Sequence, residues 1–172
     1  RGDWLTTGPA VAEFERALCD VTTAPHSVAC SSGTAALHLA YITAGVVPGD
    51  KVIVPAVTFA ASANAAKYIG AIPVFADVDP ETGLMTPETF SAALDIAGTV
   101  AAVVPVHLAG QVCDMPGIAE IARPRGIKII EDACHAIGGM PDEGAGQTAV
   151  GACDHSDAAA FSFHPVKTIA MG

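Results

Sequence analysis

A lysine stands near the end of the sequence, in a segment that has no other Lys, Arg, Asp or Glu. Lys167 follows residues 158–163, an apolar run that predicts a buried strand, and Pro165 separates the two. A lysine amine that is removed from water loses its proton more readily, so it can act as a nucleophile and form a Schiff base with a carbonyl compound. The alternative is a lysine at a strand end whose stem packs on apolar surface while its amine stays in water. These residues alone favour the alternative, and the motifs below favour the nucleophile.

Asp132 is a second candidate, because it directly follows an apolar strand predicted at residues 127–130. A buried carboxylate is costly unless it is paired. A protonated ring nitrogen at ~4 Å, with an effective dielectric constant of ~20, would attract it by about 4 kcal/mol. Alternatively, Asp132 caps a helix or pairs with a basic residue such as Lys128. His135, three residues further on, either faces the same site or satisfies a carbonyl group in the core.

The segment Ser32-Gly33-Thr34-Ala35 joins a predicted strand to a predicted helix. Glycine lets the backbone approach a ligand closely, and the first N–H groups of a helix attract anions. The alternative is an ordinary helix N-cap. The sequence contains neither the G-x-G-x-x-G nor the G-x-x-x-x-G-K-[ST] loop, so the two common nucleotide-binding motifs are absent.

Phe59 follows a predicted strand and begins a predicted helix. An aromatic side chain at this place can stack on a planar ring, or it can be part of the core. Taken together, the candidates provide an anion site, an aromatic face, an acid for a ring nitrogen and a lysine for a Schiff base. This combination is typical of a site for pyridoxal 5′-phosphate (PLP).

The elements that would position these residues alternate between strand and helix. Uninterrupted apolar strands such as residues 100–106 are typical of parallel sheets that are covered on both faces. We therefore expect an α/β fold, a three-layer α/β/α sandwich with a mostly parallel sheet, in which ligands bind at the carboxyl ends of the strands. Strands are predicted at 27–30, 51–54, 72–75, 100–106, 127–130 and 158–163, helices at 9–18, 35–44, 59–69, from 86 and at 115–123, and a glycine-rich loop at 140–148.

Composition excludes several functions. The 172 residues carry a net charge of −10 with only eight Lys and Arg, which argues against binding to nucleic acid or to an anionic membrane. No uncharged apolar run approaches the ~20 residues of a membrane helix. The five cysteines are odd in number and widely spaced, which predicts reduced thiols in a cytoplasmic protein. Cys134-His135 has no second pair at metal-ligand spacing, so we expect no metal site.

Seven short motifs occur in order along the chain: LTTGP (5–9), SSGTAALH (31–38), PAVTF (55–59), PVFADVD (73–79), PVHLAG (105–110), EDACHA (131–136) and FSFHPVK (161–167). As an ordered set they resemble the DegT/DnrJ/EryC1/StrS family of nucleotide-sugar aminotransferases. That resemblance implies the fold type I architecture of PLP enzymes. It implies that Lys167 is the catalytic Schiff-base lysine, that Asp132 binds the pyridine nitrogen and that Phe59 stacks on the ring. The other cofactor contacts that it implies are Gly33, Thr34, Ala35, His135 and Ser162.

The resemblance also implies a reaction. Some relatives with histidine in place of the lysine are sugar dehydratases, so Lys167 indicates an aminotransferase. An amino acid, by analogy glutamate, would donate its amino group to a nucleotide-linked 4-keto-6-deoxy sugar for surface-glycan biosynthesis. The nearest type within the family is the 4-amino-4,6-dideoxy-N-acetyl-altrosamine transaminase. The active site in this family lies between two subunits, which implies a homodimer.

Family members are much longer than this chain. We therefore expect residues 1–172 to form the PLP-binding large domain, incomplete at its C-terminal end, without the C-terminal small domain. The alternative is a truncated, non-catalytic fragment that self-associates and binds the cofactor weakly or not at all.

Overall fold

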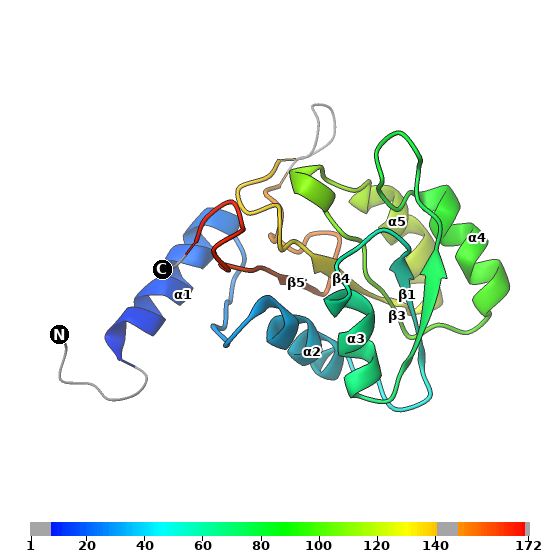
Figure 1. Cartoon of the computed structure of the whole chain (residues 1–172), viewed down its shortest axis with the longest axis horizontal. Coiled ribbons are helices and arrows are strands. Elements are labelled where there is room, and N and C mark those ends of the chain that lie inside the picture. Colours follow the sequence, from blue (N-terminus) through cyan, green and yellow to red (C-terminus); the bar gives the residue numbers. More distant parts are fainter. Residues whose placement is uncertain (1–7, 141–147, 171–172) are drawn as a thin grey trace.

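The computed structural model describes residues 8–140 and 148–170, and it is built on one parallel sheet (Figure 1). The sheet has five strands in the order β2-β1-β3-β4-β5, and each neighbouring pair is parallel. The strands are β1 (Lys51–Pro55), β2 (Ile72–Ala76), β3 (Ala102–Val103), β4 (Lys128–Asp132) and β5 (Ala158–Ala160). The predicted α/β class and parallel sheet are confirmed.

Helices cover both faces of the sheet, as the three-layer prediction requires. Two apolar clusters form around it, and alternate residues of one strand enter different clusters: Ile129 of β4 belongs to one and Ile130 to the other. The first cluster lies under α4 (Pro87–Ala97) and α5 (Met115–Ala122). The second lies under α2 (Gly33–Thr43) and α3 (Ala61–Tyr68). Short 3-10 turns occur at η1 (Leu108–Gly110) and η2 (Arg123–Arg125).

The first helix, α1 (Pro9–Thr22), extends beyond the predicted 9–18 and lies to one side of the sheet (Figure 1). It contacts the last described segment of the chain, where the rings of Phe14 and Phe163 meet edge to face with centroids 5.0 Å apart. Most of the predicted motif at 5–9, and most of the glycine-rich loop at 140–148, lie outside the described residues. The helix predicted from residue 86 is α4, and Thr86 is its N-cap, in a full capping box with Thr89.

Three strand predictions differ from the structure. The strand predicted at 100–106 is reduced to β3 and a bridge from Val106 to Asp132, because Pro105 has no N–H to donate to a ladder. The strand predicted at 158–163 ends at Ala160, opposite Asp132, where its partner β4 ends. The third difference, at 27–30, has another cause.

Residues 27–30 do not form the predicted buried strand. The backbone here is bonded to α1: the Ser27 hydroxyl donates to the Glu15 carbonyl at 2.6 Å, and the Ala29 N–H donates to the Glu15 carboxylate at 2.8 Å. Among the described residues no strand lies alongside to complete a ladder, and Val28 is 78% exposed. The prediction was wrong because apolar residues alone do not supply a partner strand.

In the described part of the chain, no helix combines the length and the apolar character that crossing a membrane would require.

Candidate functional site

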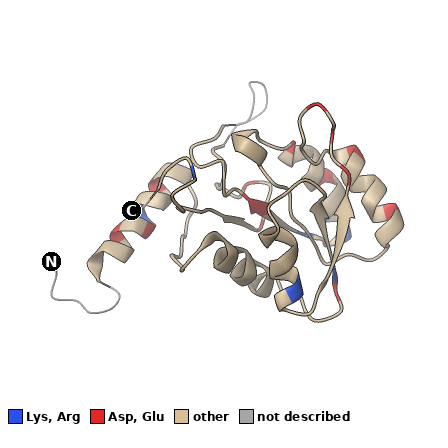
Figure 2. Ribbon diagram, in the orientation of Figure 1, with Lys and Arg blue, Asp and Glu red and all other residues tan. Residues whose placement is uncertain are grey.

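Asp132 is a buried acid at the carboxyl end of β4, with only 4% of its surface exposed. One carboxylate oxygen, Oδ2, accepts a hydrogen bond from the Ser62 hydroxyl at 2.7 Å, and Oδ1 accepts one from the Cys134 N–H at 3.3 Å. Among the described residues it forms no ion pair with Lys, Arg or His. In Figure 2, the acidic end of β4 lies in the middle of the molecule, within largely uncharged ribbon. The carboxylate is therefore held in place but has no cation of its own.

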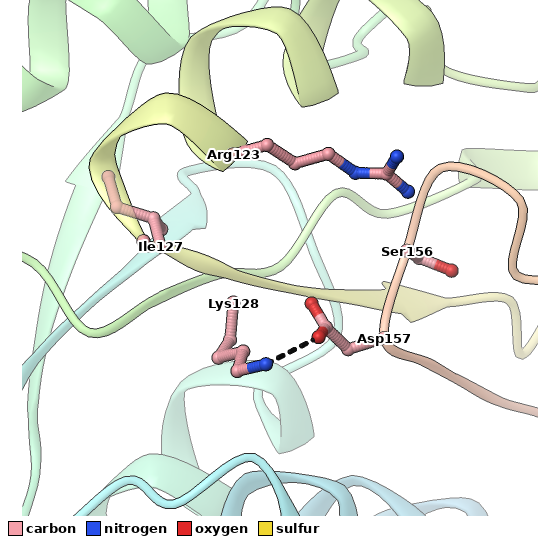
Figure 3. A pocket seen from close by; sticks show the side chains of 6 residues that line it. Arg123, Ile127, Lys128, Ser156 and Asp157 are labelled. Carbon is pink, nitrogen blue, oxygen red and sulfur yellow. Dashed lines mark hydrogen bonds and ion pairs between the residues drawn. The ribbon is translucent and has the colours of Figure 1, made fainter.

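The suggested ion pair between Asp132 and Lys128 is wrong. Lys128 begins β4 and Asp132 ends it, so the two lie at opposite edges of the sheet. The Lys128 amine instead pairs with Asp157 at 2.7 Å (Figure 3). That pair borders a cavity of about 250 Å³ at the amino end of β4, whose other lining residues are Arg123, Gly126, Ile127 and Ser156. This cavity is separate from the Asp132 site.

Ser62 is a polar partner of Asp132 that was not among the predicted site residues, and Thr58 is in turn a partner of Ser62. Ser62 lies in the first turn of α3, is fully buried and lies with its oxygen 2.7 Å from the Thr58 hydroxyl. The buried hydroxyl of Tyr41 donates to the Ser62 carbonyl at 2.8 Å, and burial together with the charge of Asp132 raises the pKa of Tyr41. Tyr41 therefore stays protonated and links α2 to the start of α3.

Lys167 and His135 meet, as the prediction of a shared site requires. The Lys167 amine lies 2.7 Å from His135 Nε2, and both residues are partly buried. The N–H of Ala109 donates to the other ring nitrogen, Nδ1, at 3.4 Å. Burial and then the charge of Lys167 lower the pKa of His135, and the charge of Asp132 opposes them. An ammonium group can only donate, so this contact forms either between a charged Lys167 and an unprotonated Nε2 or between an uncharged Lys167 and a protonated Nε2.

The start of α2 has a side-chain N-cap and two backbone N–H groups that, among the described residues, have no acceptor. The Ser32 hydroxyl accepts from the Ala35 N–H at 3.1 Å, so the N-cap alternative is correct as far as it goes. The N–H groups of Gly33 and Thr34 have no acceptor among the described residues. A Cβ on Gly33 would lie 2.9 Å from the Cβ of Ser162. The helix start therefore lies directly against Ser162, and two N–H groups remain for an anion.

Phe59 is 69% exposed, so the alternative that it belongs to the core is wrong. It lies between β1 and α3, at the carboxyl edge of the sheet, and its carbonyl accepts from the Ser62 N–H at 3.2 Å. An exposed ring anchored next to the Asp132 partners is available to a flat ligand.

His107, which belongs to the motif at 105–110, is fully buried in a separate network. Its Nε2 lies 3.0 Å from Glu131, and the Cys113 N–H donates to its Nδ1 at 3.1 Å. The Ser156 hydroxyl donates to the other Glu131 oxygen at 2.5 Å. Because all its polar atoms are used within the protein, this network holds the strands together and is not available to a ligand.

The site fits the expected cofactor. Gly33 lets the start of α2 lie directly against Ser162, and within the described residues its N–H and that of Thr34 have no acceptor. The buried Asp132 carboxylate, which has no ion-pair partner in the same part of the chain, is held nearby. Asp132 and Lys167 both act on the pKa of the Cys134 thiol, which burial raises first, so the acid and the amine share one environment. No group of three or more His, Cys, Asp or Glu side chains in the described residues could hold a metal ion.

Comparison with known proteins agrees with this geometry. The chain is 42% identical over 170 residues to GDP-perosamine synthase of Caulobacter vibrioides, covering 98% of this chain and 44% of that protein. An aminotransferase structure from Psychrobacter cryohalolentis superposes with a TM-score of 0.87 at 36% identity, over 96% of this chain and 40% of the other. The PLP form of the Spr1654 protein of Streptococcus pneumoniae gives 0.86 at 34%, over 99% and 45%.

The chain thus spans less than half the length of each of these relatives. The family model nevertheless matches all of residues 1–172, the whole sequence in which the seven motifs were found. The chain belongs to the DegT/DnrJ/EryC1/StrS aminotransferase family.

Proposed function

We propose that this chain is the PLP-binding part of a sugar aminotransferase. The observation that carries the proposal is the buried Asp132 carboxylate, in the same environment as the Lys167–His135 pair. Ser62 and Cys134 donate hydrogen bonds to it, but within residues 8–140 and 148–170 it has no ion-pair partner. A protonated ring nitrogen supplies the missing charge. Pyridoxal phosphate is the cofactor, in line with the Spr1654 protein, whose solved structures include a PLP form and a PMP form.

Every predicted site residue except Ala35 has a place in this proposal. Asp132 holds the ring nitrogen and Phe59 covers one face of the ring. The phosphate is held at the start of α2 by the N–H groups of Gly33 and Thr34 and by the Ser162 hydroxyl, while the Ala35 N–H is used by the Ser32 cap. When bound, the cofactor supplies an electron sink for the carbon that carries the amine.

Lys167 both attaches the cofactor and, once released, moves protons as general base and acid. His135 is placed to support it, because its ring contacts the amine at 2.7 Å and is itself fixed by the Ala109 N–H. Burial lowers the pKa of His135, which favours the uncharged ring. An uncharged ring beside the amine leaves Lys167 free of electrostatic repulsion from a second cation.

For the substrates we propose an amino-acid donor, glutamate by analogy, and a nucleotide-linked 4-keto-6-deoxy sugar as acceptor, in surface-glycan biosynthesis. Support comes from a relative that is named as the synthase of a GDP-linked sugar, perosamine. A homodimer, in which a partner completes the site, is part of the same proposal.

The test is covalent trapping of the cofactor. The chain is incubated with PLP, reduced with borohydride and mapped by peptide mass spectrometry. Label on Lys167, lost in Lys167→Ala and retained in Lys128→Ala, is the expected result. Lys128 is a fitting control because it pairs with Asp157 at the opposite edge of the sheet. Label on Lys51, Lys67 or Lys128 would contradict the assignment, and trapping on Lys167 without turnover would favour the non-catalytic alternative for the chain alone.

A further inference from the structure

The hydroxyl of Ser62 lies at a junction of three hydrogen-bonding groups. Its oxygen is 2.7 Å from Asp132 Oδ2, 2.7 Å from the Thr58 hydroxyl and 3.3 Å from the Phe59 carbonyl. Ser62 is fully buried, and the strand that carries Asp132 lies 70 residues away in sequence. Because the side chain is enclosed, water cannot substitute for any of these contacts.

The directions of the hydrogen bonds among Thr58, Ser62 and Asp132 follow from the number of protons available to donate. Ser62 has one hydroxyl proton, and the bond to an ionised carboxylate is both shorter and stronger than a bond to the Phe59 carbonyl. Ser62 therefore donates to Asp132. The contact of 2.7 Å between Ser62 and Thr58 then needs a donor, which has to be Thr58. The direction runs from Thr58 through Ser62 to Asp132.

This order fixes how the carboxylate faces the site. Oδ2 is held by Ser62 and Oδ1 by the Cys134 N–H, so each oxygen keeps unused acceptor capacity. Thr58 immediately precedes Phe59, the exposed ring at this edge of the sheet. The acid that would meet the ring nitrogen and the aromatic residue that would cover the ring are thus held by one continuous set of contacts.

We propose that Ser62, supported by Thr58, is a positioning residue that fixes the orientation of the Asp132 carboxylate for a protonated ring nitrogen. This inference rests on the proposed function for the identity of the cation. Its structural half, the effect of Ser62 on Asp132, can be measured without any cofactor. The two can therefore fail independently.

The first measurement uses the cofactor-free chain labelled with ¹³C at the aspartate side chains. Asp132→Asn identifies the Asp132 carboxyl resonance. We expect Ser62→Ala to move this resonance and Thr58→Val to move it less. The matched control is Ser91→Ala in α4, on the opposite face of the sheet, which should leave it unchanged. An unmoved resonance in folded Ser62→Ala would overturn the inference, and Thr58→Val keeps the test available if Ser62→Ala does not fold.

The second measurement is a cycle of PLP affinities. Ser62→Ala should weaken binding about tenfold, the effect of one charge-assisted hydrogen bond, in the chain that retains Asp132. In the Asp132→Asn background the same substitution should have little effect, because the carboxylate charge that Ser62 orients toward the ring nitrogen is absent. Equal losses in both backgrounds would show that Ser62 acts only through general packing. Failure of the parent chain to bind PLP would overturn the proposed function, while the carboxyl resonance would still decide the role of Ser62.

Discussion

Gly33→Ala tests the close approach between the start of α2 and the segment that carries Ser162. A Cβ placed on Gly33 would lie 2.9 Å from the Ser162 Cβ and 3.0 Å from the Cys134 sulfur. Both distances are too short for carbon and sulfur atoms, and a third neighbour, the Phe161 carbonyl oxygen, lies at 3.4 Å. The substitution therefore has to push the helix start and the 161–162 backbone apart.

The expected magnitude is a balance of two effects. Alanine in place of glycine within a helix ordinarily stabilises a protein by about 0.5–1 kcal/mol, because it restricts the unfolded chain and favours the helix. Forcing an extra carbon into a packed contact costs about 1–3 kcal/mol. At two contacts near 3.0 Å the second effect should win. We expect Gly33→Ala to lower the free energy of unfolding by about 1–2 kcal/mol.

Urea unfolding followed by circular dichroism measures this change, and an unaltered dependence on urea confirms that the same fold is being compared. A double-mutant cycle with Ser162→Gly, which removes the nearest atom, isolates the contact. Gly33→Ala should cost less in the Ser162→Gly background than in the parent chain. A Gly33→Ala chain as stable as the parent, or more stable, would refute the reasoning.

Three further predictions follow from other parts of the structure. Asp132→Asn should leave the unfolding free energy close to that of the parent but weaken PLP binding at least tenfold, by titration, since an amide cannot replace an attraction of about 4 kcal/mol; unchanged affinity would count against the role of Asp132. Burial opposes a low pKa at Asp157, but the Lys128 amine and the Ile129 N–H outweigh it and lower the pKa. The stabilisation of the fold by Asp157 is therefore present above its unfolded pKa and is lost as the pH falls through its folded pKa. Asp157→Asn should lower the free energy of unfolding by up to about 1 kcal/mol at neutral pH and by little in acid. Urea unfolding at both pH values measures this difference. Thr86→Ala should lower the unfolding free energy by about 1–2 kcal/mol through loss of the capping box, and an unchanged urea midpoint would contradict that.

The alternation of strands and helices, and the edge at which the site lies, could be predicted from the sequence because both depend on local patterns. Apolar runs bounded by Pro and Gly marked β1, β2 and β4 to within a residue or two. Parallel strands then bring their carboxyl ends to one edge, so Asp132 and Phe59 had to approach each other. These predictions needed no knowledge of partners distant in sequence.

Predictions that depended on a distant partner were less successful. Residues 27–30 have strand-like composition, but their backbone bonds to Glu15 of α1. Ser62 carries no sequence signal of its own, since a serine within an alanine-rich helix is common, and its importance comes from a carboxylate 70 residues away. A search for hydroxyl side chains in the first turn of a helix that follows a strand would have included Ser62, together with many residues that have no such role.

The adjacent acids Glu131 and Asp132 lie on opposite faces of β4, so one has a structural role and the other is available to a ligand. Successive side chains of a strand point to opposite faces, so Glu131 shares the face of Ile129 and Asp132 the face of Ile130. Glu131 thereby meets His107 and Ser156, and both of its oxygens are satisfied within the protein. Asp132 meets Ser62 on the side of α2 and α3, where the free N–H groups of the α2 start also lie. A shift of one residue in the pairing of β4 would exchange the two carboxylates, so the register of this strand determines which acid is available to a ligand.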